Sequence, residues 1–268
     1  MEITSLSNEK VKYIKSLNEK KFRQKYNAFY IEGVKVVSEL LDIYKEKAIN
    51  IEFIAYSLNL LKKVNGYREV LEKVKKSGIE VIEIENNIFE KVVETVTTQG
   101  ILCVVKIKDI SLNDIDVSKN ILILDKVQDS GNLGTIIRTA NAFGVSNIIC
   151  TKGTTDVYSQ KVVRSTMLSI LKTSIVYVDN IDEMFKFLKE NDYLILATSL
   201  KESSYLESKS FDKKCAIVLG NEANGVDAEI LKKSDKIIKI KINDEVESLN
   251  VAVAASILLY EQFKNNKK

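Results

Sequence analysis

Proline, histidine and tryptophan are all absent from this sequence of 268 residues. An average usage of roughly 5% would place about 13 prolines in a chain of this length. A designed or alphabet-restricted sequence is one explanation of the triple absence. Because histidine is the commonest general base, acid–base chemistry here must use carboxylates, Lys, Tyr, Cys or a group on the substrate.

Cysteine is scarce, and long apolar runs are missing. Cys103, Cys150 and Cys215 lie far apart in apolar stretches, without a C-x-x-C pair or a histidine to complete a zinc site. We predict three buried apolar cysteines and no metal. The sequence has no run of about 18 uncharged apolar residues and no apolar leader at its start, so we predict a cytoplasmic protein without a membrane partner.

Positive charge is concentrated near the N-terminus, although the net charge of the chain is only +3. Residues 9–26 carry seven basic side chains interleaved with three aromatic ones, and Lys12, Lys21 and Arg23 are among the basic residues. Basic helices with aromatics suit RNA, because phosphates supply affinity and unstacked bases can stack on rings. The alternative is an ordinary solvated helix face.

The first part of the chain has an α/β pattern. Apolar periodicity predicts strands at 29–33, 51–57, 79–85 and 100–107, with helices at 34–44, 60–78 and 87–96. We predict a small α/β domain over residues 1–106 and a polar linker over 107–119.

Residues 120–268 alternate more regularly. Strands are predicted at 121–127, 147–151, 193–199, 215–220 and 236–242, with helices between them and a last helix at 249–263. This alternation predicts a parallel sheet with helices on both faces. Ligands of such sheets bind beyond the carboxyl ends of the strands.

Polar residues gather in three loops that follow predicted strands: 129–139, 220–225 and 243–250. The residues are Asn132, Arg138, Glu222, Ser248 and Asn250. Taken singly, Asn132 and Ser248 could be helix N-caps, Arg138 a surface ion-pair residue and Glu222 a first-turn residue. Their convergence on one sheet edge favours a binding site. G-x-G-x-x-G and G-x-x-x-x-G-K-[ST] are both absent, which disfavours a nucleotide-phosphate loop.

Three segments in order, DSGNLGTIIRTANAFG, IVLGNEANGV and IKIKINDEVESLNVAVAAS, carry a resemblance to a known family. They resemble the motifs of the SpoU/TrmH RNA 2′-O-ribose methyltransferases of the SPOUT superfamily, whose catalytic domain is a trefoil-knotted parallel-sheet α/β fold. ITSLSNEKVKYIKSL, FYIEGVKVV and TTQGILCVV are similar to the RNA-binding substrate module of that family. The resemblance covers nearly the whole chain.

The resemblance implies S-adenosylmethionine as the methyl donor and a homodimer as the assembly. It implies that the cofactor pocket is lined by Gly220, Ile240, Leu249 and Asn250, with Thr198 nearby. It also places Arg138 at the catalytic position, Glu222 where it orients Arg138 or the ribose, and Asn132, Ser248 and Asn250 where they shape the loops. Lys161 and Arg164 become candidates for the dimer interface or for RNA.

The expected substrate is large-subunit ribosomal RNA, because an RNA-binding module accompanies the catalytic domain. The alternatives are a transfer RNA methyltransferase, a catalytically silent RNA-binding protein of the same fold, and an α/β protein for another nucleotide. Departures from the family motifs favour the silent protein: Ser130, Gln160, Leu168 and Lys241 stand where the family commonly has proline or glycine. The retained polar residues disfavour it: Asn132, Arg138, Glu222, Ser248 and Asn250. Loss of proline is expected to loosen the cofactor loops.

Overall fold

The computed structural model describes residues 2–201, 204–206, 211 and 213–265, which form two compact units. The first unit contains Met1–Asp109 and Tyr158–Leu168, and the second contains Ile110–Val157 and Ser169–Lys268. The segment 158–168 follows a strand of the second unit in sequence but packs in the first. The predicted division into residues 1–106, 107–119 and 120–268 is continuous along the chain, so it assigns the segment 158–168 to the second domain.

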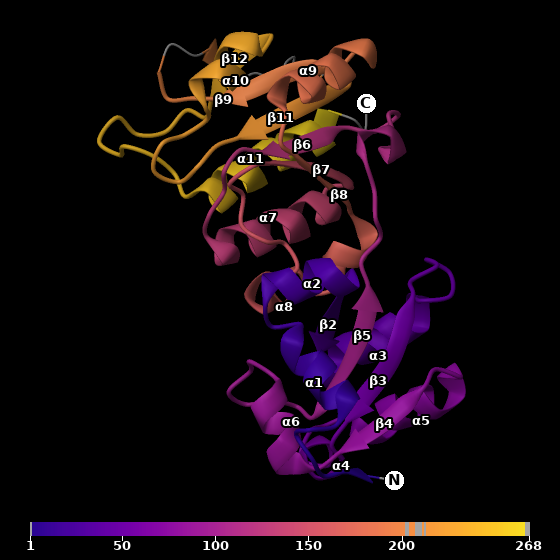
Figure 1. The fold of residues 1–268 in the computed structure, drawn as a ribbon. Helices are drawn as coiled ribbons and strands as arrows, with labels where there is room; N and C mark the ends of the chain where they lie inside the picture. The colour runs from indigo at the N-terminus through magenta and orange to yellow at the C-terminus, as the bar shows by residue number, and fades with distance from the viewer. Residues whose placement is uncertain (1, 202–203, 207–210, 212, 266–268) are drawn as a thin grey trace. The chain divides into compact units, whose positions relative to one another are not determined.

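The first unit has a five-stranded sheet in the order β1-β4-β3-β5-β2 (Figure 1). Strand β5 runs antiparallel to both β2 and β3, whereas β3 and β4 are parallel. The four predicted strands are present, and the two-residue β1 was not predicted. The elements are β1 Glu2–Ile3, α1 Glu9–Ser16, α2 Lys20–Tyr26, β2 Ala28–Glu32, α3 Val34–Ile43, β3 Ile51–Tyr56, α4 Leu58–Leu61, α5 Tyr67–Ser77, β4 Val81–Ile84, α6 Asn86–Val92, β5 Ile101–Lys106 and α8 Gln160–Thr166.

The basic N-terminal stretch forms two helices rather than one continuous segment. Asn8 caps α1 by accepting from the amides of Lys10 and Val11, and buried Val11 and Ile14 anchor the helix on the sheet. The predicted helix at 60–78 is also divided, because Gly66 has a φ of +83° immediately before α5. Helix α4 has already ended at Leu61, and the left-handed Gly66 prevents the helical hydrogen-bond ladder from starting again before Tyr67.

The second unit has a seven-stranded sheet in the order β10-β12-β9-β11-β6-β7-β8, and every described pair in it is parallel. Our prediction of a parallel sheet is confirmed, but it omitted the edge strand β8 and the short β10. The elements are η1 Leu112–Asp114, β6 Ile121–Leu124, α7 Ser130–Ala142, β7 Asn147–Thr151, η2 Ser169–Lys172, β8 Ser174–Val178, α9 Ile181–Glu190, β9 Leu194–Thr198, β10 Ser204–Tyr205, β11 Cys215–Leu219, α10 Ala228–Lys233, β12 Lys236–Lys239 and α11 Val251–Asn265.

Helices cover both faces of this sheet, as predicted: α9 and α10 lie on one face and α7 and α11 on the other (Figure 1). Side chains alternate along each strand, so Ile121 and Ile123 join the core beneath α9 and α10. The three cysteines are buried and unpaired, which confirms the prediction for them. Among the described residues, none of the helices combines the length and apolar character that crossing a bilayer requires.

Candidate functional site at the carboxyl edge of the parallel sheet

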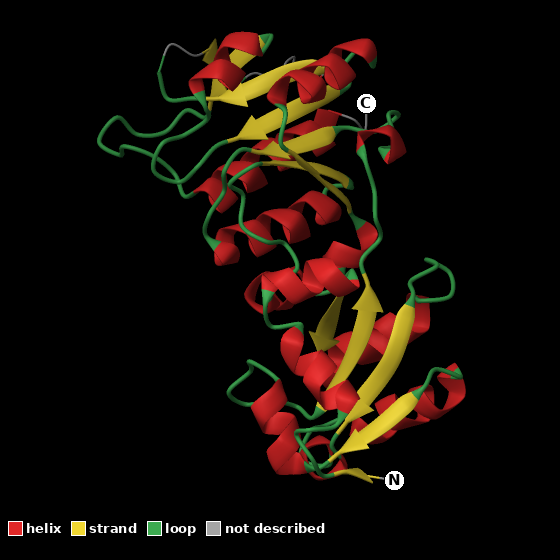
Figure 2. Ribbon diagram, in the orientation of Figure 1, coloured by secondary structure: helices red, strands yellow, loops and turns green. Residues whose placement is uncertain are grey.

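The strand order brings the candidate loops together. Strands β12, β9, β11 and β6 are consecutive neighbours and parallel, so the loops that follow them leave the same edge of the sheet (Figure 2). Thr198 is the last residue of β9, Gly220 follows β11, and Ile240 follows β12. These three residues therefore lie at one edge although more than 40 positions separate the first from the last.

Glu222 joins the loop after β11 to the loop after β6. Its carboxylate accepts hydrogen bonds from the amides of Gln128 at 3.2 Å and Asp129 at 3.1 Å, and from Asn132 Nδ2 at 3.1 Å. Burial raises the pKa of the Glu222 carboxyl, but the hydrogen bonds lower it by more than burial raises it. The resulting pKa is below the ordinary value. Glu222 therefore holds the start of α7 as a carboxylate.

Asn250 adds the third loop to this network. Its Nδ2 donates to Asn132 Oδ1 at 2.9 Å, and its Oδ1 accepts from the amide of Ala252 at 2.9 Å. Asn250 is thus the N-cap of α11. Ser248 is exposed and does not cap that helix, so the N-cap alternative for Ser248 is wrong.

The N-cap alternative for Asn132 is also wrong. Helix α7 begins at Ser130 and is capped by Asp129, whose Oδ1 accepts from the amide of Asn132 at 2.8 Å. The side chain of Asn132 is therefore available to link Glu222 with Asn250. This chain of three side chains connects all three candidate loops.

Sequence reasoning missed a second, buried network at the same edge. Asp125 follows β6 and is fully buried; its carboxylate accepts from Thr151 Oγ1 at 2.7 Å and from the amide of Asp227 at 2.8 Å. Lys126 Nζ forms an ion pair of 2.7 Å with Asp227, and this contact lowers the pKa of Asp227. Asp125 thus ties the ends of β6 and β7 to the loop after β11. In the sequence, the signal that could have revealed this network is Asp125, an acidic residue directly after the wholly apolar strand Ile121–Leu124.

Gly220 is required by a close approach of two backbone segments. A Cβ at this position would lie 2.1 Å from the carbonyl carbon of Gly225 and 2.2 Å from the nitrogen of Val226. Asn221 and Gly225 form an antiparallel bridge, so the loop folds back on itself at this point. The glycine therefore permits this tight loop directly after β11.

Arg138 lies on the face of α7 opposite the core, as predicted. Leu133, Ile136, Ile137 and Ala140 are buried, whereas Arg138 is exposed. Within the described part of the chain, its guanidinium has neither a hydrogen bond nor an ion pair. The bonds of Glu222 go to the α7 start, so a contact between Glu222 and Arg138 stays a prediction.

The predicted RNA-contact residues all lie in the first unit. Lys12 is exposed on α1, and Arg164 is exposed on α8. Lys21 is exposed, pairs with Glu19 at 2.9 Å, and lies 4.8 Å from the centre of the Phe22 ring.

Arg23 does not lie on this surface, contrary to expectation. It is only 4% exposed, and its Nη1 donates to the carbonyl oxygens of Leu17 and Asn18, both at 2.7 Å. The carbonyls at the end of α1 need donors, and the charged guanidinium supplies them. Arg23 joins α1 to α2, and we remove it from the candidate RNA surface.

The fold and the connected loops define an α/β protein whose three candidate loops meet at the carboxyl edge of a parallel sheet. Residues 119–260 match the model of the SpoU rRNA Methylase family, and residues 8–103 match that of the MRM3-like substrate binding domain. The chain belongs to the SpoU rRNA methylase family.

One relative and one solved structure illustrate a resemblance over nearly the whole chain. The 23S rRNA (guanosine(2553)-2'-O)-methyltransferase RlmP of Bacillus subtilis (strain 168) is 35% identical over 259 residues, which are 97% of this chain and 98% of that protein. An AdoMet-bound rRNA methyltransferase from Sinorhizobium meliloti is 29% identical with a TM-score of 0.83, over 98% of this chain and 97% of that one.

Proposed function

We propose that this protein transfers a methyl group from S-adenosylmethionine to a ribose 2′-hydroxyl of 23S ribosomal RNA. The observation that carries the proposal is the chain of hydrogen bonds from Glu222 through Asn132 to Asn250, which joins three strand-end loops. Arg138 is exposed on α7, the helix that also carries Asn132, and its guanidinium has no partner among the described residues. Membership of the SpoU family and the near full-length similarity to a 23S rRNA 2′-O-methyltransferase support it.

The residues of the sheet edge fit S-adenosylmethionine. In the described segment 241–249, a single backbone–backbone hydrogen bond is present, from the amide of Val246 to Asn243 at 3.0 Å. The amide of Glu245 donates to Asn243 Oδ1 at 3.2 Å. Among the described residues, the remaining amides and carbonyls of this segment are available to a ligand with a polar heterocyclic edge. We assign Ile240 and Leu249, both half-buried, to its apolar surface, and Thr198, Gly220 and Asn250 to the surrounding strand ends.

S-adenosylmethionine supplies an electrophilic methyl group on a sulfonium. The remaining tasks, alignment of the hydroxyl and stabilisation of its developing negative charge, belong to the protein. A guanidinium is a poor base because it stays protonated. We assign Arg138 to holding the ribose oxygen and a neighbouring phosphate, and Asn132, Glu222, Ser248 and Asn250 to shaping the loops around it.

We further propose that the protein acts as a homodimer in the cytoplasm. Val253 and Tyr260, seven positions apart on α11, are 48% and 49% exposed and lie on one face of that helix. An apolar stripe of this kind suits a second copy of the chain. Action on ribosomal RNA supports the cytoplasmic location.

The decisive experiment combines titration calorimetry with S-adenosylmethionine and methyl transfer to a Bacillus subtilis 23S rRNA transcript. We expect binding in the micromolar range, about −8 kcal/mol, and a 2′-O-methylated ribose in the product. Leu249→Arg is expected to abolish binding by placing a charge in the apolar part of the pocket. A folded dimer that binds the transcript but not the cofactor would instead establish the catalytically silent alternative.

The Glu222→Gln variant tests whether the negative charge of the Glu222 carboxylate is needed for activity. We expect kcat/KM at pH 7.5 to fall about tenfold, because a neutral amide accepts less strongly from the amides of Gln128 and Asp129. The folded pKa of Glu222 is lowered, so its stabilising contribution is present above the ordinary carboxyl pKa and is lost as pH falls through the folded pKa.

Denaturation from pH 7.5 to acid pH provides the matching readout. The stability difference between wild type and Glu222→Gln should shrink as the wild-type carboxylate becomes protonated. Glu190→Gln, on the exposed face of α9, is the control and should leave activity unchanged. A difference that stays constant down to the acid limit would rule out the proposed role of the charge.

A further inference from the structure

Lys126, in the loop between β6 and α7, has a backbone conformation that its residue type rarely adopts. Its φ is +56°, in the left-handed region that favours glycine. A non-glycine residue in this region is strained, and such strain persists only where the surrounding structure fixes the residue, often at functional sites. Glycine would remove the strain, so the physical reason for a lysine here must lie in its side chain.

The backbone of Lys126 is bonded to two other loops. Its amide donates to Thr151 Oγ1 at 3.2 Å, at the end of β7, and its carbonyl oxygen accepts from Asn221 Nδ2 at 2.9 Å, in the loop after β11. Asn221 immediately precedes Glu222, whose carboxylate holds the start of α7. Lys126 therefore lies where the loops after β6, β7 and β11 meet.

The side chain of Lys126 makes the same connection a second time. Its Nζ pairs with Asp227 Oδ2 at 2.7 Å, and its stem runs beside Gly153, where an added Cβ would lie 3.2 Å from Lys126 Cγ. The other carboxylate oxygen of Asp227 accepts from the amide of Glu229 and caps α10. The hydrogen bond to Asp227 and the charges of Asp227 and Asp125 outweigh the effect of burial and raise the pKa of Lys126 above its ordinary value, so it stays an ammonium.

Stability alone does not account for this ion pair. The side chain of Lys126 is 44% exposed and that of Asp227 is 31% exposed, and pairs with this exposure contribute little to the free energy of unfolding. The left-handed backbone opposes even that small gain. The pair does, however, constrain geometry. Asp125 Oδ2 holds the amide of Asp227 at 2.8 Å while Lys126 holds its carboxylate, and two attachments fix the orientation of a loop where one fixes only its distance.

The proposed chemistry depends on how the loops after β6 and β11 meet. The first loop leads into α7, which carries Asn132 and Arg138, and the second carries Gly220 and Glu222. Methyl transfer is an in-line displacement, so the group that holds the ribose oxygen must be aligned with the cofactor. A misplacement of about 1 Å is enough to cost about 10²-fold in rate.

We propose that Lys126 is a positioning residue for methyl transfer: its ion pair with Asp227 holds the loop after β6 against the loop after β11 in the arrangement that aligns the ribose hydroxyl with the cofactor. The inference rests on the proposed function and adds to it a residue that acts through the two loops. It predicts a loss of rate without a loss of stability, which is the opposite of what a purely structural lysine would give.

The test compares Lys126→Gly with wild type in single-turnover methylation of a Bacillus subtilis 23S rRNA transcript at saturating cofactor. We expect the rate constant to fall about tenfold, with the KM for S-adenosylmethionine within about twofold of wild type. The urea midpoint should equal or exceed that of wild type, because glycine removes the left-handed strain. Asp227→Asn keeps the oxygen that caps α10 but loses the charge, and should lose rate to the same extent.

Two further variants separate alignment from general effects. Lys126→Arg restores the charge and should recover most of the rate. The double variant with Lys126→Gly and Asp227→Asn should be no slower than either single variant, because the two residues act as one pair.

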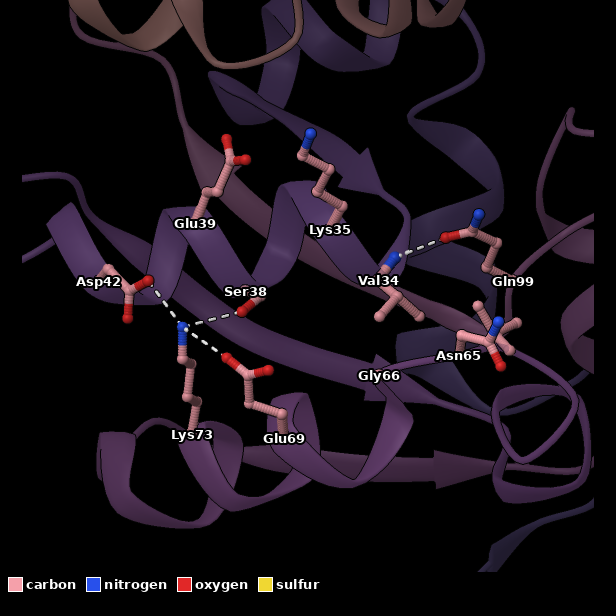
Figure 3. A pocket seen from close by; sticks show the side chains of 11 residues that line it. Val34, Lys35, Ser38, Glu39, Asp42, Asn65, Gly66, Glu69, Lys73 and Gln99 are labelled. Carbon is pink, nitrogen blue, oxygen red and sulfur yellow. Dashed lines mark hydrogen bonds and ion pairs between the residues drawn. The ribbon is translucent and has the colours of Figure 1, made fainter.

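The matched control is the ion pair of Lys73 and Asp42 in the first unit, with Nζ and Oδ2 2.6 Å apart. Figure 3 shows this pair joining α5 to α3 at one end of a surface pocket, with Glu69 beside it. Lys73→Ala removes an ion pair of similar length and should leave the rate of methyl transfer unchanged.

Loss of rate in both Lys126→Gly and Asp227→Asn, with stability and cofactor affinity retained, supports the inference. An unchanged rate in Lys126→Gly, measured beside a wild-type protein that methylates the transcript, overturns the inference and leaves the proposed function standing. Parallel losses of rate and stability also overturn it, because the lysine would then only stabilise the fold. A wild-type protein that neither binds the cofactor nor methylates the transcript overturns the proposed function and the inference with it.

Discussion

Arg138→Ala is expected to lower kcat for methyl transfer about 10²–10³-fold, the usual cost of removing one preorganised donor from a developing oxyanion. The fold should be unaffected, because the guanidinium is exposed and Leu133, Ile136 and Ile137 form the buried side of α7. Cofactor affinity should also be unchanged. Single-turnover methylation of the 23S rRNA transcript, with calorimetry for the cofactor, measures both quantities.

Two further arginine variants make this result specific. Arg138→Lys keeps the charge but loses the planar fork, and should recover only a small part of the lost rate. Arg68→Ala removes an exposed arginine of the first unit, whose contact is with the neighbouring Tyr67, and should leave the rate unchanged. Unaltered turnover in Arg138→Ala would exclude Arg138 from catalysis.

The parallel sheet could be predicted because its strands are short, apolar and separated by helices of clear period. Leu122, Leu124, Ile148 and Ile217 belong to runs that no surface helix would carry. Strand β8 was missed because it lies at the sheet edge. There Ser174 is half-buried and Tyr177 is 45% exposed, which weakens the apolar signal.

Which residues meet could be anticipated only in part. The sheet edge follows from the alternation of strands and helices, so the meeting of Asn132, Glu222 and Asn250 was within reach of the sequence. The identity of each helix cap was not, because Asp129 and Asn132 are both good caps and only the backbone geometry distinguishes them. Burial of Arg23 was hidden for a similar reason, since an amphipathic pattern counts a charged residue as exposed. The trefoil knot and the dimer stay predictions.

Gly220→Ala is expected to reduce the free energy of unfolding by about 3 kcal/mol, the upper end of the usual cost of overpacking. The added Cβ would lie 2.1 Å from the carbonyl carbon of Gly225 and 2.3 Å from its oxygen. Both obstructing atoms are backbone, so no rotamer change relieves the clash, and the loop after β11 must open. The opening displaces Glu222, two positions along, and cofactor binding should weaken together with stability.

Gly225→Ala in the same loop separates this clash from a general intolerance of side chains. Gly225 has a φ of +71°, but a Cβ there meets no atom within 4 Å. Its cost should be that of a left-handed alanine, about 1 kcal/mol. Urea denaturation and titration with S-adenosylmethionine compare the two variants directly. Equal losses would contradict the close backbone approach at Gly220, because that clash is expected to cost more than the left-handed conformation of Gly225. A clearly larger loss of stability in Gly220→Ala, with weakened cofactor binding in that variant alone, would support the proposal that this contact holds the loop after β11 in shape.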